Sequence, residues 1–82
     1  MFHKVKSVIA KENYILHVVF EDGTEKEYDV KPLFVKFPVS DELRLTPGLF
    51  EQVKVDAGGY GVCWNAEIDL ACNELWHGGQ IL

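Results

Sequence analysis

Cysteine, basic charge and long apolar runs are all scarce in this chain. Two cysteines in 82 residues are too few for the disulfide framework of a small secreted domain. No segment approaches the roughly 18 consecutive apolar residues of a membrane helix, and residues 1–6 are not followed by the apolar run of a secretory signal. We therefore expect no membrane insertion and a place in the reducing cytoplasm.

Basic residues are outnumbered by acidic ones, and unevenly so. Thirteen acids oppose eight lysines and arginines, for a net charge of −5, which is the wrong sign for a general binder of phosphate backbones. Residues 37–82 carry only Arg44 and Lys54 against seven acids. We expect a basic partner to dock on this half; the alternative is an acidic surface that only maintains solubility.

The residues that are present are sufficient for folding. Hydrophobic residues make up 48% of the chain, which is too many for a disordered protein, and the length suits one small domain. No linker, repeat or low-complexity stretch divides the sequence. We expect a single domain over residues 1–82.

The first part of the chain predicts consecutive strands. Residues 5–10 are rich in β-branched side chains, residues 11–13 are a polar break, and residues 14–20 alternate. Both faces of the alternating segment are largely apolar, which indicates a central strand covered on both sides or lying against a second subunit. One face carries Tyr14, Leu16, Val18 and Phe20, and the other carries Ile15, His17 and Val19.

The following turn sets the register of a hairpin. A two-residue loop of Asp22 and Gly23 would pair Leu16 with Asp29 and place acids on the apolar face. A three-residue loop instead pairs Leu16 with Tyr28 and moves the acids to the other face. We predict the three-residue loop, with Gly23 at positive φ in a G1 bulge.

The second half predicts shorter elements. Residues 33–37 are apolar but end at Pro38, and we assign them no element. Ser40 is placed to cap one turn over residues 41–43, and Thr46 to cap a helix that Pro47 begins and that ends near Gln52.

Two strands and a last helix complete the expected order. Residues 53–56 alternate, residues 57–59 form a turn, and a final strand points Tyr60, Val62 and Trp64 inward. Asp69 then caps a helix that runs through Leu75 and Trp76 and ends at the glycines 78–79. We predict an α+β fold in which an antiparallel sheet of about five strands carries short helices, in the order β-β-β-α-β-β-α. The residues we expect to be structural are Gly23, Phe50, Trp64, Asp69 and Leu75.

No residue pattern predicts chemistry. The three histidines and two cysteines lack zinc-ligand spacing, and a nucleophilic pair would require the fold to bring Cys63 or Cys72 beside a histidine. The acids near the C-terminus are expected at turns and caps rather than as an acid–base pair. Neither glycine cluster matches a phosphate-binding loop. We expect no metal, no cofactor and no catalytic residue.

The sequence resembles the bacterial domain-of-unknown-function family 2442 over essentially its whole length. The most specific part is the ending, in which Trp64 stands shortly before Asp69-Leu70 and Leu75 closes the motif. The other matching segments are Val-Lys-Ser-Val from residue 5, Glu-Asp-Gly-Thr after residue 20, Tyr-Asp-Val-Lys-Pro-Leu from residue 28 and Phe-Glu-Gln-Val-Lys-Val from residue 50.

The resemblance implies a small α+β protein of prokaryotes with no established activity and no catalytic residues to transfer. Some members of that family carry an added helix-turn-helix domain, and many look as if they are encoded beside a second small protein, as in a toxin–antitoxin pair. The present chain has no helix-turn-helix extension, and Cys72 stands near a position where many relatives carry proline. The resemblance therefore does not imply direct DNA binding here.

We predict an interaction or regulatory protein without catalytic activity, such as the antitoxin-like partner of a neighbouring small protein. The partner is another small protein or a second copy of the chain, and the candidate interface residues are Ile15, His17, Val19, Glu67 and Glu74. An alternative is a nucleic-acid binder that uses six lysines of the first 36 residues, although acids match them one for one. A third is a small enzyme of unknown type.

Overall fold

The protein consists of short strands and helices. The structure is a computed structural model that describes residues 2–81. Its strands are β1 (Val5–Lys11), β2 (Ile15–Phe20), β3 (Glu25–Asp29), β4 (Lys54–Val55), β5 (Gly61–Cys63), β6 (Asp69–Ala71) and β7 (Gln80–Ile81). Its α-helices are α1 (Lys31–Lys36), α2 (Glu42–Leu45) and α3 (Cys72–Gly78), and single 3-10 turns are η1 (Glu12–Tyr14), η2 (Pro38–Asp41), η3 (Phe50–Gln52) and η4 (Ala57–Gly59).

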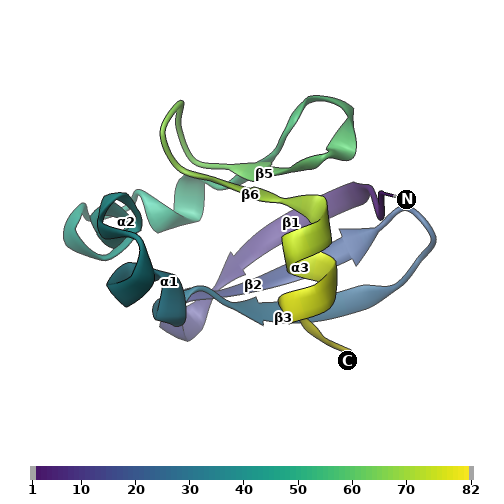
Figure 1. Cartoon of the computed structure of the whole chain (residues 1–82), viewed down its shortest axis with the longest axis horizontal. Coiled ribbons are helices and arrows are strands. Elements are labelled where there is room, and N and C mark those ends of the chain that lie inside the picture. The colour runs from purple at the N-terminus through teal and green to yellow at the C-terminus, as the bar shows by residue number, and fades with distance from the viewer. Residues whose placement is uncertain (1, 82) are drawn as a thin grey trace.

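The strands form two antiparallel sheets. The first has the order β1-β2-β3-β7 and the second the order β4-β5-β6. Figure 1 shows the second sheet above the first, with α3 running from the end of β6 down in front of the first sheet and α1 and α2 together at one end. The predicted α+β class and antiparallel pairing are confirmed. The strands are divided between two small sheets because residues 31–52 separate them with helical turns.

The predicted hairpin is confirmed in its register. Leu16 pairs with Tyr28 and Val18 with Lys26. Gly23 has a φ of +92°, and its N–H donates to the Phe20 carbonyl oxygen at 2.9 Å. This geometry is that of a three-residue loop with a left-handed third residue. Leu16 and Val18 consequently face inward, and the three acids of β3 lie on the opposite face.

The core lies between the two sheets and is closed by α3. Phe50, Trp64 and Leu75 are buried as predicted. The indole Nε1–H of Trp64 donates to the carbonyl oxygen of Phe50 at 2.9 Å, which satisfies both groups away from water. The other buried apolar residues are Val5, Leu16, Val18, Phe20, Tyr28, Val30, Leu33, Leu43, Val62, Ile68 and Cys72.

The segment 31–52 differs from the prediction. Residues 31–36 form helix α1, because Pro32 occupies its first turn, where a missing N–H costs nothing. The helix expected from Thr46 does not form. Gly48 takes a φ of +83°, which ends any helical path, and the Thr46 hydroxyl donates to the Glu42 carboxylate at 3.0 Å instead of capping. Ser40 lies within η2 and is not a side-chain cap.

Two expectations for the last third were also wrong. Tyr60 is 48% exposed, because it precedes β5 and does not belong to its inward face. Asp69 is not a helix cap: it lies on β6, paired with Cys63, and α3 begins three residues later with Ala71 at its N-cap and no side-chain cap bond. Strand β6 thus takes the place of the cap and the first residues of the predicted helix. Strand β7, which pairs with β3, was not predicted either.

Candidate functional site

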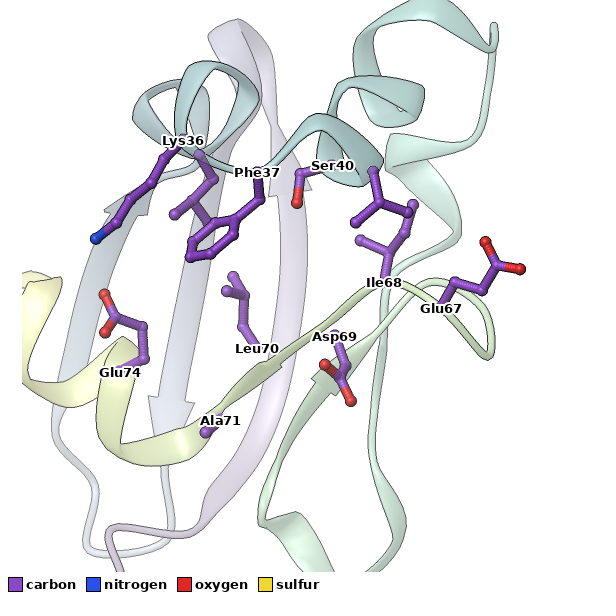
Figure 2. A pocket seen from close by; sticks show the side chains of 11 residues that line it. Lys36, Phe37, Ser40, Glu67, Ile68, Asp69, Leu70, Ala71 and Glu74 are labelled. Atoms are coloured by element: carbon purple, nitrogen blue, oxygen red, sulfur yellow. The ribbon is translucent and has the colours of Figure 1, made fainter.

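A groove of about 360 Å³ separates the α1–η2 segment from β6 and the start of α3. Figure 2 shows the two walls, with Lys36, Phe37 and Ser40 on one side and residues 67–71 and Glu74 on the other. Residues 67–71 are consecutive, so an entire stretch of chain borders the groove rather than alternate side chains. The lining residues are Leu33, Lys36, Phe37, Val39, Ser40, Glu67, Ile68, Asp69, Leu70, Ala71 and Glu74.

The middle of the groove is apolar. Phe37 and Val39 are 48% and 43% exposed, so two large apolar side chains of the α1–η2 wall are only partly covered. Leu70 reaches toward Phe37 from the opposite wall (Figure 2). The α1–η2 segment thus presents apolar surface to solvent at the place where the groove opens.

The charged residues of the groove are mostly acidic. Glu67, Asp69 and Glu74 oppose a single base, Lys36. In Figure 2, Glu67 stands at one end of the groove, and Glu74 and Lys36 stand at the other. Two of the predicted interface residues, Glu67 and Glu74, therefore lie in one site, together with Asp69, which we had assigned a structural role.

Glu74 is held in position by the core. The Tyr28 hydroxyl donates to Glu74 Oε2 at 2.9 Å. Burial, together with this hydrogen bond to a carboxylate, raises the pKa of the Tyr28 hydroxyl above the ordinary tyrosine value. The second Glu74 oxygen is not used by that bond, so the carboxylate can still accept from a ligand in the groove.

One edge of β6 borders the groove and has no partner strand within residues 2–81. The sheet order places β5 on one side of β6 only. A strand edge with exposed N–H and C=O groups is a template for pairing with another chain. The groove therefore combines backbone hydrogen-bonding groups, apolar side chains and negative charge.

The other predicted interface residues do not join this site. Ile15, His17 and Val19 lie on one face of β2, and Leu16 and Val18 lie on the other, inner face. Tyr28, whose hydroxyl donates to Glu74, is on that inner face. The three residues of the first face are half-buried, and His17 Nε2 lies 2.8 Å from Glu25 Oε1. Their assignment as an interface stays a prediction.

Three of the six lysines proposed for nucleic-acid binding already have partners within the protein. Lys26 is only 7% exposed, and its Nζ donates to the Trp76 carbonyl oxygen at 2.5 Å. Lys11 pairs with Glu27 at 3.2 Å, and Lys31 pairs with Asp29 at 3.0 Å. Among the described residues, no group of three or more His, Cys, Asp and Glu side chains is arranged to hold a metal ion. Cys63 and Cys72 are free thiols.

Sequence reasoning missed the α1–η2 wall of the groove. Lys36 and Phe37 lie in the apolar stretch, residues 33–37, to which the sequence pattern assigned no element, and Val39 follows that stretch after Pro38. The signal was present, because this stretch carries several apolar residues between Pro32 and Pro38 that no predicted element buried. An apolar segment without a place in the core indicates either a helix or exposed apolar surface. Here residues 31–36 form helix α1, and Phe37, which follows it, is 48% exposed.

Within residues 2–81, no helix has both the length and the apolarity needed to cross a membrane.

Comparison with known proteins gives one match. No curated protein and no solved structure matches the chain. A profile described as protein of unknown function DUF2442 matches residues 5–80, which is nearly the whole sequence and includes both walls of the groove. The chain therefore belongs to the DUF2442 family.

Proposed function

We propose that this protein is a non-catalytic interaction protein that binds a basic segment of another small protein in the groove between α1–η2 and β6–α3. The observation that carries the proposal is the combination of three acids with exposed apolar side chains on facing walls. Apolar contact supplies binding free energy, and the acids select basic partners and speed their approach.

The antitoxin-like role suggested by the family resemblance belongs to this proposal. An antitoxin-like protein must cover part of a neighbouring protein, and a groove with exposed Phe37 and Val39 offers a contact of that kind. We place the protein in the reducing cytoplasm, where free Cys63 and Cys72 remain thiols.

Two observations favour a protein over a nucleic acid as the partner. The groove has a surplus of acids, which repels phosphates. Of the six N-terminal lysines, Lys26 is buried, and Lys11 and Lys31 are paired with acids. With every lysine counted, the chain still carries a net charge of −5.

The experiment is an NMR titration of the ¹⁵N-labelled protein with two hexapeptides, Lys-Val-Lys-Val-Lys-Val and Glu-Val-Glu-Val-Glu-Val. We expect the basic peptide to shift the amide signals of residues 67–71 and of Phe37, and to bind more weakly as salt is added. The acidic peptide should leave these signals in place. Equal shifts with both peptides, or none with the basic one, would contradict the proposal.

A pair of matched variants isolates the groove charge from the overall charge. The double variant Glu67→Lys/Asp69→Lys and the double variant Glu12→Lys/Glu51→Lys both change the net charge from −5 to −1, because each replaces two acids with two bases. All four positions are exposed. We expect the first to weaken peptide binding by about tenfold or more and the second to have little effect. Similar losses in both would show that binding follows net charge and not the groove.

A further inference from the structure

We propose that the partner segment binds as an added β-strand, paired through its backbone with the free edge of β6. This inference rests on the proposed function and specifies how the groove is used. It commits to an extended segment of a different protein, with apolar and basic residues in alternation.

The hydrogen bonds between β5 and β6 identify the free backbone groups. The Trp64 N–H donates to the Ile68 carbonyl oxygen at 3.0 Å, and the Cys72 N–H donates to the Tyr60 carbonyl oxygen at 2.8 Å. Backbone groups alternate in direction along an antiparallel strand. Ile68, Leu70 and Cys72 therefore turn their groups toward β5.

Asp69 and Ala71 turn theirs in the opposite direction, away from β5. The Ala71 carbonyl, at the N-cap of α3, accepts the first bond of that helix. Three groups remain for a ligand: the N–H and C=O of Asp69 and the N–H of Ala71. Because residues 67–71 line the groove, a segment lying in it can reach them.

The side chains of β6 predict the pattern of the added strand. Leu70 is half-buried on the inner face with buried Ile68, whereas Asp69 and Ala71 are exposed on the outer face. Side chains of neighbouring strands share these faces. An added strand must therefore place apolar residues inward, against Leu70 and Phe37, and basic residues outward, beside Asp69.

The other sheet edges are poorer templates. Strand β1, at the edge of the first sheet, packs against β4 and η3. Strand β7, at the opposite edge, has only two residues. The β6 edge is also short, with three residues, which is how native proteins limit uncontrolled pairing.

A second copy of this chain does not provide the segment. Stretches in which basic and apolar residues alternate include Lys4-Val5-Lys6, Val35-Lys36-Phe37, Leu43-Arg44-Leu45 and Val53-Lys54-Val55. Val5 is 2% exposed within β1, and Lys54 and Val55 form β4, which pairs with β5. The other two stretches lie at the end of α1 and in α2, where Leu43 is 2% exposed. Each stretch would have to leave its strand or helix before it could bind elsewhere as an added strand. The structure therefore points to a separate protein.

The test removes one backbone donor without changing a charge. Ala71 has φ −70° and ψ 150°, which proline adopts without strain, and its side chain is exposed. Ala71→Pro deletes the N–H that faces the groove and leaves the bonds to β5, as proline is tolerated on edge strands with this orientation. Ala71→Ser is the matched control, because it keeps the N–H.

The probe is the hexapeptide Lys-Val-Lys-Val-Lys-Val, measured by NMR titration. We expect Ala71→Pro to lower the affinity about tenfold, because it removes one well-placed hydrogen bond and keeps the peptide backbone from approaching β6 closely. Ala71→Ser should bind like the unmodified protein. Thermal unfolding of both variants checks that each is folded.

A second measurement does not depend on any protein variant. The unmodified protein is titrated with the probe N-methylated at its valines and with the probe N-methylated at its lysines. Because only alternate amides of an added strand face β6, one methylated probe should lose binding and the other should keep it. Equal binding of both, with full binding to Ala71→Pro, would overturn strand addition. If the unmodified probe does not bind at all, the proposed function fails as well.

Discussion

Replacing Trp64 with phenylalanine tests the contact that joins the second sheet to the middle of the chain. Trp64 is 5% exposed, and its indole N–H donates to the carbonyl oxygen of Phe50, itself 2% exposed. The rings of the two residues are stacked at 6.0 Å between centroids. Phenylalanine keeps one ring in this contact and removes the donor.

Two costs add up in the free energy of unfolding. The Phe50 carbonyl oxygen stays buried without a partner, which costs about 1 to 3 kcal/mol. The smaller ring leaves a cavity, for which about 1 to 2 kcal/mol is a reasonable figure. We expect a total loss of about 2 to 5 kcal/mol, a large part of the roughly 4 to 12 kcal/mol that a domain of this length has.

The assay is urea unfolding followed by far-ultraviolet circular dichroism, with Trp76→Phe as the control. Trp76 is half-buried and stacks on His3, with 3.7 Å between the ring centroids. Its replacement by phenylalanine removes buried apolar area. Among the described residues it removes no buried hydrogen bond of the indole, because the Trp76 bond to Lys26 uses the backbone carbonyl oxygen. We expect that control to lose about 1 kcal/mol. A Trp64→Phe loss no larger than that of Trp76→Phe would refute the argument from the buried carbonyl.

Three further predictions concern the hairpin, β5 and the pH dependence of stability. Because the pKa of Tyr28 is raised in the folded state, this tyrosine ionises first in the unfolded state as pH rises. The free energy of unfolding should therefore fall above about pH 10. Urea unfolding from pH 8 to 11 should show a smaller fall for Tyr28→Phe than for the unmodified protein. Gly23→Ala should cost about 1 kcal/mol, since Gly23 has positive φ but open space around it. Gly61→Ala should cost more, because its Cβ would collide with the backbone of Leu70; equal melting temperatures for the two variants would contradict this.

The β1–β2–β3 meander was predictable because its determinants are local. The alternation of residues 14–20, the single glycine of the turn and the cost of burying three acids were sufficient to select one register. Nothing distant in the chain competes with these determinants. The structure has Leu16 opposite Tyr28, as the pattern required.

The second half was less predictable because tertiary contacts decide it. Thr46 and Pro47 have the residue types of a helix start, but Gly48 takes positive φ and Thr46 bonds to Glu42. Asp69 has the residue type of a helix cap, but pairing with β5 extends residues 69–71 as a strand. Local propensity is weaker than such contacts in elements of only a few residues.

The candidate site was predictable only in its charge. The surplus of acids in residues 37–82 predicted an acidic surface on this half of the chain, and Glu67 and Glu74 do line one groove. The opposite wall was not predictable, because α1 and η2 come to lie beside β6 only when the intervening chain folds. The free edge of β6 depends on a strand that the sequence pattern did not show.

The pairing of β7 with β3 has a consequence for the order of assembly during synthesis. Lys26 pairs with Ile81, and its ammonium also bonds to Trp76, so this edge is completed by residues far along the chain. The local β2–β3 hairpin can form as soon as it leaves the ribosome, since short-range contacts close fastest. Until α3 and β7 emerge, β3 is an unprotected edge and Lys26 lacks its carbonyl partner. The nascent chain is therefore most exposed to aggregation in the interval between formation of the hairpin and the emergence of α3 and β7.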